Sequence, residues 1–332
     1  MSLLFRDAAG PSLAPGGSVL CVGAFDGVHV GHRALLARAR EQARARGLLP
    51  LAISFEPIPR EFFARGEPVP RLTSAREKIR LLFEAGIERV LSLRFDAALA
   101  AMPAERFIED VLVSRAAARG ILVGSDFRFG HARRGDVAML RGYAERGGFT
   151  LEVMPDIDLG DGRVSSSAIR ERLAQGDFDA AARMLGRRFS IGGRVVRGRR
   201  LGRELGYPTA NIRLGARTSP ISGIFAVRAR GAGIAAQGSG IRAATQDDAW
   251  PGVASLGVRP TIEGGGEPLL EVHLFDFDGD LYGRRLEVEF VHKLREELKF
   301  DDLDAMVRRI DRDADEARAI LGLLRPDGRR AG

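Results

Sequence analysis

The sequence contains one cysteine, Cys21, among 332 residues. A single thiol cannot build a disulfide framework or a zinc site made of several cysteines. Cys21 also lies inside an apolar run, where a cysteine typically serves as a small buried hydrophobic residue. We therefore expect a protein that depends on its core rather than on covalent cross-links, with Cys21 as part of that core.

Long hydrophobic runs are also missing, and no stretch approaches the length of about 20 apolar residues that a membrane-spanning helix needs. The first apolar run, Leu3–Phe5, is interrupted by Arg6 and Asp7, so we expect no signal peptide. The hydrophobic content of 45% and the mean hydropathy of −0.08 are typical of a soluble globular protein. The expected location is the cytoplasm, without a membrane partner.

Lysine is scarce: Lys78, Lys293 and Lys299 are the only three, so the net charge of +7 depends almost entirely on arginine. A basic balance suits nucleic acids or polyanionic small molecules. Nucleic-acid surfaces usually interleave clustered basic residues with aromatic ones. Aromatic residues make up only 7% here, and the arginines are dispersed apart from a denser segment at 194–203. We expect no nucleic-acid partner, and a basic nucleic-acid-binding protein remains a remote alternative.

The length favours two domains. In the first half, near-continuous apolar runs alternate with segments of helical period, which predicts a doubly wound α/β domain with a parallel sheet. The strands are expected at 18–25, 51–55, 89–95, 120–127 and 149–154. The helices are expected at 32–47, 72–86, 104–118, 136–147 and 166–185, the second with a Ser74–Glu77 capping box.

The pattern changes near Phe189, where short alternating runs separated by turn residues predict an antiparallel β-barrel. These strands are expected at 190–198, 223–231, 252–258, 269–277 and 285–294, followed by one helix at about 302–323. A Gly/Ala-rich segment, 231–250, is interpreted as a long loop. The predicted domains are 1–186 and 187–332.

The stretch "VGAFDGVHVGH", residues 22–32, places His29 and His32 around Gly31 where a strand gives way to a helix. Three interpretations are open. The pair could bind a metal, although only three other histidines exist and no His-Glu-x-x-His pattern occurs. The pair could simply cap the helix. Phosphate binding explains all three residues, because a helix N-terminus offers N–H groups, glycine permits close approach and imidazoles donate hydrogen bonds. A Walker A loop is excluded, since no lysine follows a glycine here.

The His-x-Gly-His pattern after the first strand resembles the nucleotidylyltransferase superfamily. The longer match, "GAFDGVHVGHR", resembles the bacterial bifunctional riboflavin kinase/FMN adenylyltransferases, or FAD synthetases. Further motifs follow in that family's order and cover nearly the whole chain: "SFEPIPREFF" (54–63), "VGSDFRFGHARRGD" (123–136), "VSSSAIRERLAQG" (164–176), "LGRELGYPTANI" (201–212), "GVRPTI" (257–262), "LLEVHLFDFDGDLYG" (269–283) and "LREELKF" (294–300). Ile58 and Ser255 stand where the family usually has histidine and asparagine.

For the first domain, the resemblance implies that the phosphate of FMN attacks the α-phosphate of ATP and that pyrophosphate leaves. His29, His32 and Arg170 are the implied catalytic residues. The implied ATP-binding residues are Gly23, Phe25, Asp26, Gly31, Ser165, Ser166 and Ser167. Phe62 and Asp126 are the implied flavin contacts, with simple packing for Phe62 and a turn role for Asp126 as alternatives.

For the second domain, the resemblance implies transfer of the γ-phosphoryl group of ATP to riboflavin. Glu271 is the implied base, on one strand face with His273; the alternative is an ordinary solvent-facing acid. Thr209 and Asn211 are the implied magnesium ligands. Arg295 is an implied flavin contact or a surface residue. The implied ATP contacts are Gly198, Gly202, Pro208 and Asn211.

The expected reactants and cofactors follow from these two reactions. They are riboflavin, FMN and ATP as small-molecule partners, Mg²⁺ as cofactor, and FMN and FAD as substrate or product. An alternative keeps only one activity, with the kinase the more secure of the two.

Overall fold

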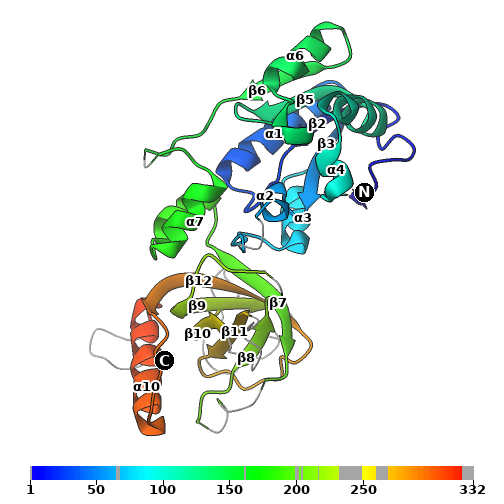
Figure 1. The fold of residues 1–332 in the computed structure, drawn as a ribbon. Coiled ribbons are helices and arrows are strands. Elements are labelled where there is room, and N and C mark those ends of the chain that lie inside the picture. Colours follow the sequence, from blue (N-terminus) through cyan, green and yellow to red (C-terminus); the bar gives the residue numbers. More distant parts are fainter. Residues whose placement is uncertain are drawn as a thin grey trace. The chain divides into compact units, whose positions relative to one another are not determined.

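The computed structural model describes residues 2–64, 68–160, 162–198, 202, 205–215, 217–231, 249–258 and 268–323. The chain forms two compact units (Figure 1). The first comprises Met1–Val69 and Thr73–Ala168, and the second comprises Pro70–Leu72 and Ile169–Gly332.

The first unit is built on a six-stranded parallel sheet with the order β1-β4-β3-β2-β5-β6. The strands are β1 (Leu3–Phe5), β2 (Ser18–Val22), β3 (Leu49–Glu56), β4 (Arg89–Arg94), β5 (Ala118–Gly124) and β6 (Thr150–Met154). From β2 the chain moves through β3 to β4 on one side, whereas β5 and β6 lie on the other side. The order therefore reverses between β2 and β5, and ligands of such folds bind at the carboxyl ends of strands at that point.

Both faces of this sheet are covered, as the apolar strands predict. Along β2, Leu20 and Val22 pack into one core cluster, whereas Val19 and Cys21 pack into the cluster on the opposite face. The helices of this unit are α1 (Val30–Ala45), α2 (Pro59–Phe62), α3 (Ala75–Glu84), α4 (Ala97–Ala101), α5 (Ala104–Arg106) and α6 (Val137–Glu145), and α7 (Ser166–Ala174) crosses the boundary to the second unit. Cys21 is fully buried, so its predicted place in the core is confirmed.

Two predicted helices differ in detail. The segment predicted at 104–118 is the short α5 followed by a π-helix, Phe107–Arg115. The segment predicted at 166–185 is two helices, α7 and α8 (Phe178–Leu185). Gly176 between them has a φ of +80°, and the Asp177 side chain accepts a hydrogen bond from the Ala180 N–H to begin α8. A left-handed glycine followed by an N-cap aspartate stops one helix and starts another.

The second unit is a closed antiparallel barrel with the strand order β10-β11-β8-β7-β12-β9. The strands are β7 (Ser190–Val196), β8 (Ala210–Arg213), β9 (Gly223–Gly231), β10 (Trp250–Val258), β11 (Pro268–Leu274) and β12 (Arg285–Arg295). Helix α10 (Leu303–Ile320) packs beside the barrel through a cluster that includes Phe275 and Ala317.

The predicted fold class is confirmed: a parallel α/β unit is followed by an antiparallel barrel and a C-terminal helix. Strands β1 and β8 are missing from the predicted set, because three and four residues are too few to show a period of two. The predicted loop at 231–250 lies mostly outside the described residues. Over the described ranges, no helix combines the length and the apolar character that crossing a membrane requires.

Candidate active sites

A cavity of about 460 Å³ opens at the carboxyl edge of the first unit's sheet. Its wall is formed by residues that follow β2, β3, β5 and β6, so it lies at the point where the strand order reverses. Eight of the predicted site residues line it: Gly23, Phe25, His29, Gly31, His32, Asp126, Ser165 and Ser166.

His29 is the N-cap of α1. Its Nδ1 accepts a hydrogen bond from the backbone N–H of His32 at 3.3 Å, so the neutral ring carries its proton on Nε2. The two imidazole rings are stacked, with their centroids 3.7 Å apart and an angle of 19° between the planes. His29 therefore caps helix α1 and also lines the cavity.

His32 is kept neutral by its surroundings. Burial, and then the positive charges of His29 and Lys78, hold the pKa of His32 well below its ordinary value of 6.5. In the described part of the chain its Nδ1 has no hydrogen-bond partner. His32 is thus available as a neutral hydrogen-bonding group beside His29, at the N-terminus of a helix whose dipole favours anions.

Four arginines that the sequence analysis did not single out, Arg60, Arg128, Arg133 and Arg163, line the same cavity. Arg163 pairs with Asp126 at 2.7 Å and with Asp156 at 3.1 Å, whereas Arg128 pairs with Asp136 at 2.8 Å. Two of these arginines, Arg128 and Arg133, lie in the "RFGHARRGD" segment of a family motif, which was the only indication of them in the sequence. The wall carries more positive than negative side chains and suits a polyanionic ligand.

The hydroxyls of the "SSS" segment have local partners. Ser165 Oγ accepts a hydrogen bond from the Ala168 N–H at 3.1 Å, and Ser166 Oγ donates to the Asp26 carbonyl at 2.9 Å. Ser167 lies off the cavity wall, where its Oγ accepts a hydrogen bond from Arg60 at 3.1 Å.

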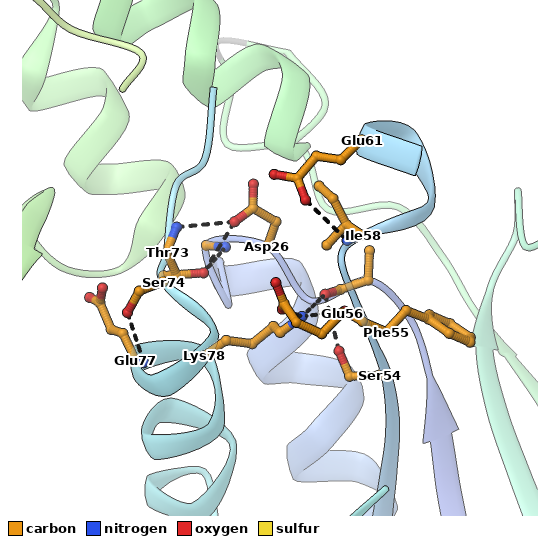
Figure 2. A network of polar contacts seen from close by, with 12 residues as sticks. Asp26, Ser54, Phe55, Glu56, Ile58, Glu61, Thr73, Ser74, Glu77 and Lys78 are labelled. Atoms are coloured by element: carbon orange, nitrogen blue, oxygen red, sulfur yellow. Dashed lines mark hydrogen bonds and ion pairs between the residues drawn. The ribbon is translucent and has the colours of Figure 1, made fainter. Parts of the chain in front are cut away.

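Three other predicted residues also lie off the cavity wall. The buried Asp26 carboxylate accepts hydrogen bonds from the N–H and the hydroxyl of Thr73, at 3.0 and 3.1 Å (Figure 2). Arg170 belongs to the second unit, and its Nε donates to the Pro70 carbonyl at 2.6 Å. Phe62 is 38% exposed and packs edge-on against two other phenylalanine rings.

In the barrel, three strands bring polar residues into one row. Asn211 on β8 is the cross-strand partner of Glu271 on β11, and Glu271 is the partner of Ser255 on β10. Asn211 is 5% exposed, and its Nδ2 donates to Thr209 Oγ1 at 3.3 Å. Its Oδ1 is buried and has no hydrogen-bond partner within the described ranges. Oxygen atoms of this kind are the ligands that Mg²⁺ prefers, so these residues fit the implied metal.

Two glycines lie close to this row. A Cβ on Gly198 would come within 2.8 Å of the Asn211 carboxamide, and one on Gly202 would collide with the Tyr207 carbonyl oxygen. The Tyr207 N–H donates to the Gly202 carbonyl at 2.6 Å. Two of the implied ATP contacts, Gly198 and Gly202, thus pack directly against the "YPTAN" residues, where only glycine fits.

The comparisons with known proteins match both units. A FAD synthetase family model matches residues 12–168, and a riboflavin kinase family model matches residues 185–321. The chain belongs to the bifunctional riboflavin kinase/FMN adenylyltransferase family. It is 44% identical over 304 residues to the member from Pseudomonas fluorescens, covering 92% of this chain and 93% of the relative. It is 42% identical to the member from Escherichia coli K12, covering 93% and 95%.

A solved structure has a similar fold. It is a structure of a macrolide-efflux protein from Streptococcus pneumoniae, with a TM-score of 0.74, 27% identity and coverage of 94% of this chain and 97% of the other. The family resemblance expected from the motifs is confirmed. The chain is a bifunctional enzyme that phosphorylates riboflavin to FMN and adenylylates FMN to FAD.

Within this family assignment, the surroundings of Glu271 and Arg295 are informative. His273, two residues from Glu271 on β11, contacts the Pro208 carbonyl through Nδ1 at 3.0 Å, and burial lowers its pKa. Glu271 and His273 are half-buried, whereas Phe275, in the turn after β11, is 2% exposed and packs in the cluster under α10. Arg295 forms a two-pronged ion pair with the buried Asp313 of α10, at 2.6–3.0 Å.

Proposed function

We propose that the cavity of the first unit is the adenylyltransferase site and that His29 and His32 contact the phosphates of ATP there. The carrying observation is the stacked histidine pair at the N-terminus of α1, with His32 kept neutral, on the wall of a cavity rich in arginine. An FMN phosphate oxygen attacks the α-phosphorus of ATP, a new P–O bond forms, and the bond to the bridging oxygen of pyrophosphate breaks. Neutral imidazoles donate hydrogen bonds to the oxygens on which charge accumulates.

The remaining residues of this site serve binding. Gly23 and Gly31 allow the nucleotide to approach the backbone, and Phe25 lies beside its base. Ser165, Ser166, Ser167 and Asp26 hold the ATP side, Arg170 supplies a fixed positive charge, and Phe62 and Asp126 contact the flavin. Ile58, 2% exposed on the cavity wall, gives this site an apolar patch.

The barrel carries the kinase site in this proposal. Mg²⁺, when bound to Thr209 and Asn211, neutralises the negative charge of the ATP phosphates. Gly198, Gly202 and Pro208 form the segment over those phosphates. Glu271 accepts the proton of the ribityl hydroxyl as that oxygen attacks the γ-phosphorus and ADP leaves. Arg295 contacts the flavin from the end of β12.

The division of the chain is proposed as 1–186 for adenylyl transfer and 187–332 for phosphorylation. The partners are riboflavin, FMN and ATP, without nucleic acid or membrane, and the location is the cytoplasm. The ordinary hydropathy and the dispersed arginines support these proposals.

The test uses the full chain with riboflavin and ATP, with Mg²⁺ or with EDTA, and separates the flavins by chromatography over time. We expect FMN to appear first and FAD to follow when Mg²⁺ is present, with neither product in EDTA. FMN formation at the same rate in EDTA would contradict the assignment of Thr209 and Asn211 as magnesium ligands.

A further inference from the structure

Lys78 has an unusual position for a lysine. It lies on α3, its side chain is 0% exposed, and it is one of only three lysines in the chain. Its Nζ donates to the carbonyl oxygens of Phe55 at 2.7 Å and Ala24 at 3.3 Å, and it pairs with the Glu56 carboxylate at 3.1 Å (Figure 2). An ammonium group has three donors, and burying one is costly unless it is paired and hydrogen-bonded.

The two residues whose carbonyl oxygens accept hydrogen bonds from Lys78 line the cavity. Ala24 follows β2 and Phe55 lies at the end of β3, two strands that are neighbours in the sheet, and both residues line the cavity. Ser54 Oγ also donates to the Ala24 carbonyl, at 3.3 Å. The register of β2 with β3 ends at the pair of Val22 with Ile53, and the Lys78 ammonium joins the two chain segments just beyond that pair.

We propose that Lys78 is a positioning residue for adenylyl transfer, whose buried ammonium fixes the chain segments after β2 and β3 in the geometry of the cavity wall. The inference rests on the proposed assignment of this cavity to the adenylyltransferase reaction. Both segments carry residues assigned to it, Gly23 and Phe25 after β2 and Ile58 after β3. A displacement of about 1 Å in such a wall lowers a rate by about 100-fold.

The charge of Lys78 has a second consequence. It is one of the causes, after burial and alongside His29, that lower the pKa of His32. Without Lys78, the pKa of His32 rises toward 6.5, and the ring titrates nearer to neutral pH. Lys78 itself lies behind the cavity wall, whose charged side chains are Arg60, Asp126, Arg128, Arg133, Asp156 and Arg163.

The test compares Lys78→Met, which removes the charge and the donors, with Lys78→Gln, which removes the charge and keeps an N–H₂ donor. Lys299→Met makes the same chemical change at an exposed lysine of the second unit and is the matched control. For each full-length variant, kcat and KM are measured for adenylylation of supplied FMN, and the riboflavin kinase rate of the same sample is recorded. The pKa of His32 is followed by NMR of the ring protons, assigned with His32→Gln.

In Lys78→Met we expect kcat for adenylylation to fall about 100-fold, phosphorylation of riboflavin to stay within about twofold of the parent, and the pKa of His32 to rise. In Lys78→Gln the same rise in pKa is expected with a smaller loss of kcat, about tenfold. Lys299→Met is expected to match the parent in every measurement.

Three results would overturn the inference. One is adenylylation at the parent rate in folded Lys78→Met, and another is an equal loss of both activities. If Lys78→Met fails to fold, Lys78→Gln decides, and a parent rate with an unchanged His32 pKa in that variant overturns it. His32→Gln tests the site assignment separately: full adenylylation in that variant removes the cavity from the reaction, whatever Lys78 does.

Discussion

Asn211 and Glu271 face each other across neighbouring barrel strands, in a register that also pairs Glu271 with Ser255. Direct cross-strand partners have Cβ atoms about 5 Å apart. An amide oxygen and a carboxylate at that separation can serve two adjacent groups, a phosphate-bound cation and the hydroxyl that attacks the phosphate. In the proposed kinase site, these two groups therefore lie on strands of the barrel rather than on loops.

We predict that Glu271→Gln abolishes FMN formation from riboflavin, with a loss of at least about 100-fold, because the amide cannot accept the hydroxyl proton. Conversion of supplied FMN to FAD is expected to continue at the parent rate. Both rates are measured by chromatography of the flavins. Glu316→Gln, at an exposed glutamate of α10, is the control and leaves both rates unchanged. Loss of both activities in folded Glu271→Gln would contradict the division between the two units.

We predict the converse for His32→Gln. Removal of one hydrogen-bonding group from the phosphate site lowers the rate of FAD formation by about 100- to 1,000-fold, while riboflavin phosphorylation continues. His292→Gln, at an exposed histidine of the barrel, is the control. An unchanged rate of FAD formation would remove His32 from the site.

The environment of His32 also predicts how stability depends on pH. Its pKa in the folded chain lies below 6.5, so below pH 6.5 the unfolded chain binds a proton that the folded chain does not. Stability is therefore present above pH 6.5 and decreases as pH falls from 6.5 toward the folded-state pKa, by at most about 1.4 kcal/mol per pH unit for one group. Urea unfolding of the first unit at several pH values measures this. His32→Gln is expected to reduce the slope, and an identical slope in that variant would refute the explanation.

Gly198→Ala is predicted to impair the kinase alone. Its Cβ would come within 2.8 Å of the Asn211 carboxamide, so the amide must move from its position between Thr209 and Glu271. We expect riboflavin phosphorylation to fall about tenfold to 100-fold, since a shift of about 1 Å in a reacting site can cost about 100-fold and the Asn211 side chain can absorb part of it. Gly192→Ala on β7 is the matched control, because its Cβ would meet its nearest atom at an ordinary 3.6 Å. Equal kinase rates in the two variants would contradict the proposed role of Gly198 beside the ATP phosphates.

Arg295→Met is predicted to destabilise the second unit by about 3 kcal/mol, because it leaves the buried carboxylate of Asp313 without its two-pronged partner. Arg309 also contacts Asp313 at 3.0 Å and limits the loss. Thermal unfolding measures the stability, and the KM for riboflavin is measured on the same samples. An unchanged melting temperature with a raised KM would show that the flavin contact, rather than the ion pair, is the main role of Arg295.

The sequence predicts the fold well where one face or both faces of an element are buried. The runs at 18–25 and 120–127 contain β2 and β5, because buried parallel strands are apolar almost throughout. The short β8 and the break at Gly176 were missed, since four residues show no period and a single glycine within a helical pattern is tolerated.

The same limit applies to the sites. His29, His32 and Gly31 are adjacent in sequence and could be recognised as one motif. Lys78 could not be recognised from the sequence, because a single lysine on an amphipathic helix is usually exposed to solvent. Its partners, at the ends of β2 and β3, are brought to it only by the fold. Arg295 was likewise interpreted without Asp313, which lies 18 residues later on α10.

The central claim is that residues 1–186 and residues 187–332 each carry one complete reaction, and mixing two impaired variants tests it most directly. His32→Gln and Glu271→Gln are each incubated with riboflavin, ATP and Mg²⁺, alone and together, and the flavins are separated. We predict FMN alone from His32→Gln, no product from Glu271→Gln, and FAD from the mixture, since FMN made by one variant is adenylylated by the other. A mixture that forms FAD no faster than either variant does by itself would contradict the account.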